Sequence, residues 1–396
     1  MVALLGLILV VMGAGWWFYG GRVLRKNRLE LTPKPGIPTR AVLIPARDEG
    51  AVIEGLLLSL QEQTLPVPMR DVYVIVERAD DPTVGIAERY GARVIFRTNL
   101  KRQRKGYALD EALKQILPRW RYDLYFIFDA DNILARDYME QILESYAKGY
   151  QLATGYRNSK NANANVVAAV SSLTFSMINV LGNKNRIKKG ANVIFSGTGC
   201  YVDGRLIDKW QGWPFHSLTE DYEMSLYATL HSIPTFYNEE AEFYDEQPTR
   251  YRQTVDQRVR WIKGYFSARR KYIPLMRKRK RAQNIGSIKR EAIGVRPIIM
   301  MLVGVIVMIV GLLVELCLRG EVAMAIGLVI ALLAVVYLVL MFITLEMVKR
   351  EKIKLRKQIK WRAVLFNPLY LVTYIPCALR ALLVRDVKWK KIDHGK

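Results

Sequence analysis

Residues 125–134 read YFIFDADNIL, an apolar run that ends in two carboxylates one residue apart, Asp129 and Asp131. The apolar part has the length and composition of a buried strand. Upstream of it, apolar or β-branched runs alternate with segments of helical spacing, at residues 41–44, 52–60, 72–76, 82–90, 94–96, 106–117 and 124–128. This alternation is typical of βαβ units and predicts an α/β domain with a mostly parallel sheet.

Polar residues follow three of these predicted strands. The first strand is followed by PARDE (45–49), the second by Glu77 and the last by DAD (129–131). Ligands of such sheets bind beyond the carboxyl ends of the strands, so we expect these residues on one rim. Two carboxylates at a rigid strand end suit Mg²⁺ or Mn²⁺, which bind oxygen ligands and bridge carboxylates to phosphates. A DxD pattern alone is more simply a solvated turn, so the metal site depends on further motifs.

The positive charge of the chain lies beside its longest apolar runs. The formal net charge is +24, and basic clusters follow residues 2–20, precede 297–318 and follow 322–345. Each run is long enough to cross a bilayer as a helix. The positive-inside rule then predicts three spans of the cell membrane, with the N-terminus outside and the globular domain in the cytoplasm. Anionic lipid accounts for the charge. No nucleic-acid-binding signature is present, so we expect no nucleic acid partner.

Two apolar runs have an alternative interpretation. Residues 2–20 also resemble a cleaved signal peptide, although no basic residues precede them. Residues 363–384 have the length of a span but contain Asn367, Pro368 and Arg380. We interpret 363–384 as an interfacial or re-entrant segment followed by a cytoplasmic tail, with a fourth span as the alternative.

The predicted organisation has five parts. They are an N-terminal transmembrane helix (1–21), the α/β domain (40–265), a basic juxtamembrane or interfacial segment (266–296), a transmembrane helical hairpin (297–345) and a final basic and apolar segment with the tail (346–396). The three cysteines, Cys200, Cys317 and Cys377, lie far apart in the sequence. This spacing argues against a disulfide framework or a cysteine-based zinc site.

Three further motifs follow DAD along the chain. They are FSGTGCYVD at 195–203, TED at 219–221 and QRVRW at 257–261. In this order the motifs resemble the processive, membrane-bound family 2 glycosyltransferases, such as the cellulose, chitin, hyaluronan and poly-N-acetylglucosamine synthases. The resemblance covers residues 40–265 and extends to one span before this domain and several after it. It implies a GT-A fold and the inverting transfer of a sugar from a nucleotide-activated donor.

The resemblance implies a role for each matching residue. Asp221 of TED matches the general base, which takes the proton of the acceptor hydroxyl, and we expect Glu220 and Glu223 beside it to raise its pKa. Asp131 matches the ligand of a metal that would neutralise charge on the leaving diphosphate. The positions that match nucleotide-sugar contacts are Pro45, Ala46, Asp48, Glu77, Lys105, Asp129, Gln257 and Arg260.

The residues that match acceptor contacts are Gly199, Cys200, Glu220 and Trp261. Two of them allow another interpretation, because a tryptophan such as Trp261 also occurs at membrane interfaces and Cys200 is better read as a small buried thiol. The sequence departs from the family at Glu77, where an aspartate is usual. The longer side chain can still accept a hydrogen bond from a uracil N–H, but the departure weakens the assignment of uridine over other nucleotides.

The predicted function is the transfer of N-acetylglucosamine or glucose from a UDP-sugar to a growing cell-surface polysaccharide. The alternative enzyme transfers one sugar to a membrane lipid, and the few spans favour it because a polymer needs a wide helical channel. Three or four spans would form such a channel only with a second subunit or as a homo-oligomer. Outside enzymes, a degenerate membrane scaffold is the alternative, but the motif residues of DAD, TED and QRVRW are all present, which argues against it.

Overall fold

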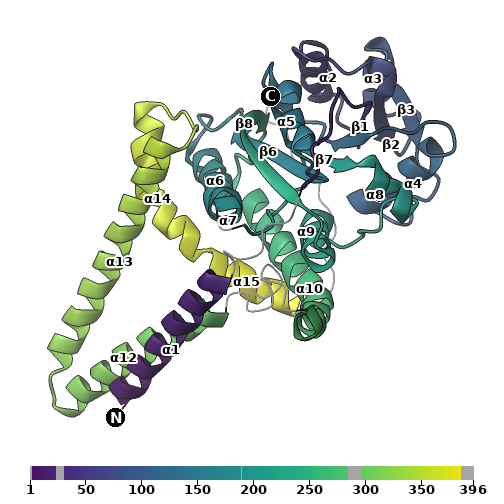
Figure 1. The fold of residues 1–396 in the computed structure, drawn as a ribbon. Coiled ribbons are helices and arrows are strands. Elements are labelled where there is room, and N and C mark those ends of the chain that lie inside the picture. Colours follow the sequence, from purple (N-terminus) through teal and green to yellow (C-terminus); the bar gives the residue numbers. More distant parts are fainter. Residues whose placement is uncertain (1, 24–30, 189, 284–295, 385–396) are drawn as a thin grey trace. The chain divides into compact units, whose positions relative to one another are not determined.

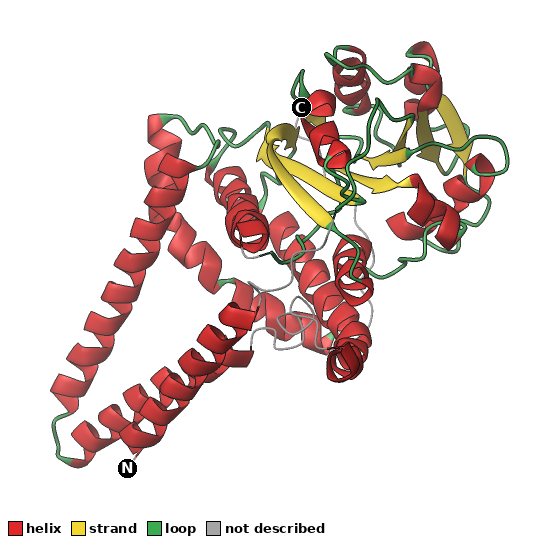
Figure 2. Ribbon diagram, in the orientation of Figure 1, coloured by secondary structure: helices red, strands yellow, loops and turns green. Residues whose placement is uncertain are grey.

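The computed structural model describes residues 2–23, 31–188, 190–283 and 296–384 (Figures 1 and 2). The chain forms two compact units. One comprises Met1–Arg28, Lys189–Ala191 and Ile273–Glu346, and the other comprises Leu29–Lys188, Asn192–Tyr272 and Met347–Lys396. The second unit contains the predicted α/β domain.

The α/β unit is built on an eight-stranded sheet with the order β3-β2-β1-β4-β7-β6-β8-β5. The strands are β1 Arg40–Pro45, β2 Val72–Val76, β3 Arg93–Phe96, β4 Leu124–Ile127, β5 Ile133–Leu134, β6 Leu152–Ser159, β7 Cys200–Asp203 and β8 Thr235–Asp245. Strands β3, β2, β1 and β4 are parallel, with Val42 in register with both Val72 and Phe126. Strand β7 joins β4 and β6 antiparallel, β6 and β8 run parallel, and β5 is antiparallel to β8. The sheet is therefore mixed beyond β4.

Helices cover both faces of this sheet (Figure 1). They are α2 Ile53–Gln61, α3 Pro82–Arg89, α4 Lys105–Ile116, α5 Tyr138–Ala147, α8 Gly204–Trp210 and α9 Glu220–His231, with a short 3-10 turn η2 at Met69–Asp71. One core contains Leu43 and Tyr125 with residues of α4, α8 and α9. The other contains Val42 and Phe126 with residues of α2, α3 and α5. Because both faces are buried, β1, β2 and β4 are continuously apolar rather than alternating.

The predicted elements up to residue 128 are confirmed. Each strand and helix expected there is present, and its ends differ from the prediction by a residue at most. Strands β6, β7 and β8 were not predicted. The boundary placed at residue 265 falls inside α10 Tyr251–Gln283, so the juxtamembrane segment begins as a continuation of a helix of the α/β unit.

Several helices of the α/β unit lie outside its sheet layers. They are α6 Val166–Met177, the π-helix η3 Ile178–Lys184, α7 Asn185–Lys188, α14 Lys357–Val372 and α15 Tyr374–Leu383. Helix α14 packs on α6 through a small core that includes Leu173, Ala363 and Tyr370. Large apolar side chains on the other side of α14 and α15, such as Phe366 and Leu379, are exposed.

The other unit is an assembly of long apolar helices. It contains α1 Val2–Val23, α12 Arg296–Leu318 and most of α13 Val322–Arg350. Helices α1 and α12 pack closely, and a Cβ added to Gly6 would lie 2.6 Å from the carbonyl oxygen of Gly304. Glycine at this crossing therefore allows the two backbones to approach.

Three helices in the described ranges are long and apolar enough to cross a membrane. They are Val166–Lys188, Val322–Arg350 and Lys357–Leu383, and shorter apolar stretches occur at Leu5–Gly15 and Val303–Leu318. These helices indicate membrane association. The candidate Val166–Lys188 was not predicted, and 61% of its most apolar window is buried inside the protein, so its apolar side chains also serve packing.

Candidate active site

A cavity of about 1280 Å³ opens at the carboxyl ends of the parallel strands. Strand-end residues form one side of it, and residues of α6, η3, α9, α10 and the α14–α15 junction form the rest. The predicted site residues on its wall are Pro45, Ala46, Glu77, Lys105, Asp129, Asp131, Glu220, Asp221, Gln257, Arg260 and Trp261. The fold thus gathers residues from four separate motifs around one space.

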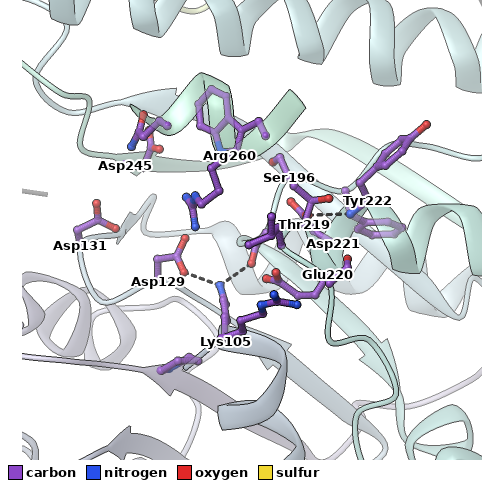
Figure 3. A pocket seen from close by; sticks show the side chains of 18 of the residues that line it. Lys105, Asp129, Asp131, Ser196, Thr219, Glu220, Asp221, Tyr222, Asp245 and Arg260 are labelled. Carbon is purple, nitrogen blue, oxygen red and sulfur yellow. Dashed lines mark hydrogen bonds and ion pairs between the residues drawn. The ribbon is translucent and has the colours of Figure 1, made fainter. Parts of the chain in front are cut away.

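Asp129 at the end of β4 is held by groups from three segments (Figure 3). Its carboxylate forms an ion pair with Lys105, the first residue of α4, whose ammonium also donates to the carbonyl of Gly197 at 2.7 Å. Its backbone N–H donates to Thr198 Oγ1 at 2.9 Å. Burial acts to lower the pKa of Lys105, but the carboxylates of Asp129 and Glu220 oppose this and the pKa is raised. Lys105 is therefore a fixed positive charge inside the cavity.

Among these carboxylates, the negative charge of Asp131 is the least compensated by hydrogen-bond donors and ion pairs. Asn132 Nδ2 donates to it at 3.3 Å, and no ion pair to it is found among the described residues. Burial, followed by the negative charges of Asp129 and Asp245, raises its pKa to about 7. A site of this kind favours a cation, so Asp131 fits the predicted metal ligand. No cluster of three or more metal-binding side chains occurs in the described ranges, so substrate oxygens and water would complete the shell of Mg²⁺ or Mn²⁺.

Two residues of the cavity wall near Asp131 were not identified from the sequence. They are Asp245 at the end of β8 and Arg157 in β6. They form a buried ion pair and both line the cavity. Arg157 also donates to the carbonyl of Ser196 at 2.7 Å, and its guanidinium lies 3.8 Å from the ring centroid of Phe175. The pair therefore fixes the wall beside Asp131. Neither residue was assigned a role from the sequence.

Asp221 lies in the first turn of α9 and faces the cavity from the opposite side (Figure 3). The backbone N–H of Tyr222 donates to its Oδ1 at 2.7 Å. A Cβ added to Gly197 would lie only 3.3 Å from Oδ2 of Asp221, and Gly197 has a φ of +88°. The backbone conformation therefore favours glycine at 197, and a side chain there would crowd Asp221.

Asp221 and Glu220 form a pair of buried acids. Burial raises the pKa of Asp221, against the opposing charges of Lys105 and Arg260. Burial and the charge of Asp221 raise the pKa of Glu220 to about 7. The expected contribution of Glu223 is not found, because Glu223 accepts from the backbone N–H of Ser217 and pairs with Lys271 instead. Burial is the largest cause of the raised pKa of Asp221, and this burial could not be deduced from the sequence.

Helix α10 divides the QRVRW motif between two environments. Gln257, Arg260 and Trp261 line the cavity, and Trp261 packs edge-on against Phe175. Arg258 is fully buried on another side of the helix, where it donates to Thr373 Oγ1 at 2.6 Å. Its guanidinium lies 4.3 Å and 4.8 Å from the ring centroids of Tyr370 and Tyr374. Arg258 therefore holds α10 against the α14–α15 junction, a role that the motif did not reveal.

The part of the cavity that lies between helices, away from the strand ends, is apolar. Its wall is formed by Phe175, Met177, Ile178 and Leu181 of α6 and η3, Ile262 and Tyr265 of α10, and Leu371 and Tyr374 at the α14–α15 junction. A π-helix such as η3 is rare and often occurs at functional sites. The cavity thus has a charged half at the strand ends and an apolar half between helices.

Three predicted site residues do not line this cavity. Asp48 has its backbone N–H bonded to Asp81 and its carboxylate paired with Arg78, so it supports the loop after β1. Gly199 accepts from the backbone N–H of Gly155, and Cys200 is buried in a core of the sheet. Gly199 directly precedes β7 and Cys200 begins it, and both are buried away from the cavity wall, so the structure gives no support to direct acceptor contacts by these two residues. The buried-thiol interpretation fits Cys200.

Comparison with known proteins gives a consistent result. Residues 38–264 match the sequence model described as "Glycosyltransferase like family 2". The probable glycosyltransferase YdaM of Bacillus subtilis (strain 168) is 23% identical over 61% of this chain and 57% of its own length. A beta-monoglucosyldiacylglycerol synthase of Trichormus variabilis is 24% identical over 58% of this chain and 49% of its own. The chain thus spans about half the length of these curated relatives.

One solved structure resembles the whole chain. It is the mannosyltransferase PcManGT from Pyrobaculum calidifontis in complex with GDP-Man and Mn²⁺. The TM-score is 0.62, and the match covers 98% of this chain and 100% of that one at 16% identity. At this identity the likeness concerns the fold alone.

Proposed function

Because this chain belongs to glycosyltransferase family 2, we propose that it moves a sugar from a UDP-sugar to a hydroxyl group of a membrane-bound acceptor, with inversion at the anomeric carbon. The family and the GT-A fold expected from the motifs are confirmed, and the chain is a glycosyltransferase. The donor, the acceptor and the residue roles below are our proposal.

The observation that carries the proposal is the meeting of Asp221 with the charged strand ends in one cavity. A displacement with inversion needs a base on the side of the sugar opposite the leaving group. Asp129 and Asp221 lie on opposite sides of the cavity, and Arg260 reaches in on the Asp129 side (Figure 3). A sugar in this space would have its diphosphate at the Asp129 side and an acceptor hydroxyl at the Asp221 side.

Each of these side chains then has its own role in the transfer of the sugar. Asp221 takes the proton of the acceptor hydroxyl as that oxygen attacks the anomeric carbon, and its raised pKa makes it a stronger base than an exposed aspartate. Lys105 and Arg260 place positive charge where the leaving diphosphate gains negative charge. A divalent cation, Mg²⁺ or Mn²⁺, held by Asp131 would neutralise that diphosphate further. The solved mannosyltransferase of similar fold contains Mn²⁺, which supports such a cation.

We propose a membrane lipid as the acceptor. The apolar half of the cavity supports this acceptor. Burial of a hydrocarbon chain there is favourable by about 25 cal/mol for each Å² of apolar surface that is removed from water. The matching relatives named for making monoglucosyldiacylglycerol support the same acceptor class and glucose as the sugar. Helices that could cross a membrane would bring the cavity to its acceptor at the cytoplasmic face of the cell membrane.

A growing cell-surface polysaccharide, with N-acetylglucosamine as a candidate unit, is the second proposal. The presence of Glu220, Asp221 and Trp261 on the wall of one cavity favours it, because the TED and QRVRW motifs together resemble those of processive enzymes. An aromatic side chain such as Trp261 can support the terminal sugar of a polymer. This function would also require a second subunit or a homo-oligomer to enclose a channel.

The test is sugar transfer by the full chain in detergent with added lipid. Wild type and Asp221→Asn are incubated with UDP-glucose or UDP-N-acetylglucosamine, Mn²⁺ and diacylglycerol, and both UDP release and product size are measured. We expect release with one donor, a glycolipid product, and a loss of at least about 1000-fold in Asp221→Asn. A long polymer would favour the second proposal. Equal release by the variant would reject Asp221 as the base.

A further inference from the structure

Residues 160–165, which join β6 to α6, are bonded to the segment that follows β8. Asn161 Nδ2 donates to the carbonyl of Gln247 at 2.8 Å, and the backbone N–H of Gln247 donates back to Asn161 Oδ1 at 2.8 Å. Beside them, the backbone N–H of Lys160 donates to the carbonyl of Asp245 at 2.9 Å. Gln247 lines the cavity, whereas Asn161 does not. The backbone of Gln247 is therefore fixed in both directions by an amide that lies outside the cavity.

The side chain of Gln247 extends this series of hydrogen bonds to the cavity wall. Gln247 is 3% exposed, and its Nε2 donates to Asp245 Oδ1 at 2.8 Å. The other oxygen of Asp245 pairs with Arg157, whose Nε donates to it at 2.7 Å. Both oxygens of this buried carboxylate thus have a donor, which fixes the orientation of the carboxylate and of the guanidinium. Without the amide of Gln247, one buried oxygen would lose its partner, and the carboxylate would turn and take Arg157 with it.

Arg157 is a positive charge placed among the acids of the strand ends. Burial acts to lower its pKa, but the carboxylates of Asp245, Asp129 and Asp131 oppose this, and the pKa is raised. Asp129 and Asp131 border the space in which the donor diphosphate is proposed to bind. A fixed charge stabilises developing negative charge best when it needs no rearrangement during the reaction. A displacement of about 1 Å in such a site can reduce the rate by about 100-fold.

We propose that Asn161 and Gln247 are positioning residues for the transfer of the sugar. They act through Asp245 and Arg157, whose arrangement they hold ready for the donor diphosphate. The inference rests on the proposed function, since it assumes that a diphosphate binds at the charged strand ends. It gives a role in the reaction to a segment that lies outside the DAD, TED and QRVRW motifs.

The experiment compares wild type, Asn161→Ala, Gln247→Met and the double variant as full chains in detergent. Sugar transfer from UDP-glucose or UDP-N-acetylglucosamine to diacylglycerol is measured with Mn²⁺, at a temperature below the melting temperature of every variant. Each single variant should lose about tenfold in kcat. The double variant should lose no more than either single variant, because both substitutions break the same series of hydrogen bonds. Losses that multiply in the double variant would overturn the inference.

Asn163 provides a matched control in the same segment. Its Nδ2 donates to the carbonyl of Lys354 at 2.8 Å, and its Oδ1 accepts from the backbone N–H of Arg356 at 2.7 Å. It therefore makes the same kinds of bond as Asn161, but neither Asn163 nor these partners line the cavity. Asn163→Ala should lower the melting temperature and keep the kcat of wild type. Equal losses of kcat in the two asparagine variants would show a merely structural role and overturn the inference.

Binding of UDP in the presence of Mn²⁺, measured by calorimetry, separates this outcome from that of the proposed function. The UDP affinity should fall about fivefold in Asn161→Ala and Gln247→Met, because the displaced Arg157 attracts the diphosphate less, and stay constant in Asn163→Ala. This pattern in a protein that transfers no sugar would reject the transfer and retain the positioning roles. Transfer by wild type, with unchanged kcat and UDP affinity in Asn161→Ala and Gln247→Met, would retain the transfer and reject the positioning roles. Failure of wild type to bind UDP would reject both.

Discussion

The two halves of the cavity are constructed differently. The charged half is assembled from residues that directly follow β1, β2, β3 and β4, which are neighbours in the sheet. The apolar half is assembled from α6 and η3, α10 and the α14–α15 junction, which are far apart in the sequence. A strand end places its residue by local structure, whereas a helical wall exists only after the helices pack. The charged half can therefore be predicted from motifs, and the apolar half cannot.

Of the variants that separate the two halves, Asp131→Ala in the charged half is expected to have the largest effect. The variant should lose at least about 100-fold in Mn²⁺-dependent affinity for UDP, because the residues that the structure describes contain no cluster of three or more metal-binding side chains to replace it. Titration of UDP with and without Mn²⁺ measures this loss. Asp80→Ala is the control, since Asp80 is 80% exposed and outside the cavity. Unchanged Mn²⁺ dependence in Asp131→Ala would remove the metal from this half.

A smaller effect is expected in the apolar half from Leu181→Gln. Leu181 lines the cavity but is 61% exposed, so the change should not disturb folding. Loss of its contact with a lipid chain, worth about 1 kcal/mol, should raise the KM for the lipid acceptor about fivefold. UDP affinity should stay constant. Leu58→Gln, at an exposed position of α2, is the control. An unchanged KM for lipid would show that the apolar half does not bind the acceptor. It would support a polymer acceptor instead.

The smallest effect is expected from Glu220→Gln, which lies where the two halves meet. Asp221 must be ionised to act as base, so activity should rise with pH as the Asp221–Glu220 pair loses its protons, in the range around the Glu220 pKa of about 7. Lys105, Arg260 and Arg157 face Asp221 and act in the opposite direction to burial. Removing the charge of Glu220 should move the rise to lower pH by about half a unit. The pH profile of kcat/KM measures the shift, and a shift to higher pH would contradict the coupling.

The same acid pair also makes stability depend on pH. The folded pKa of Glu220 lies above its ordinary value, so folding binds protons between about pH 4.5 and 7. The stabilisation of the protonated carboxyl is complete below that range and is lost as the pH rises through about 7. The melting temperature of wild type should fall over this interval more than that of Glu220→Gln. An identical fall in both would show that Glu220 is not the titrating group.

The elements from β1 to β4 were predicted to within a residue, because apolar runs buried on both faces alternate with amphipathic helices. Strands β6, β7 and β8 have mixed patterns, and their pairing is set by contacts between distant segments. Asp221 and Asp131 were located by motif, but the causes of their raised pKa values are burial and neighbours brought by the fold. No role was assigned to Asp245 or Arg157, because their pairing joins segments far apart in the sequence.

The buried guanidinium of Arg258 limits how the chain can be divided. The segment that carries every recognisable motif ends at residue 264, yet Tyr370, Thr373 and Tyr374, which surround Arg258, come more than one hundred positions later. A truncated protein that stops after the motifs would have Arg258 facing water and the cavity open where Leu371 and Tyr374 had closed it. For recombinant expression or domain grafting, the smallest working catalyst therefore includes α14 and α15, and the interrupted helices near the C-terminus are as much a part of the enzyme as its aspartates.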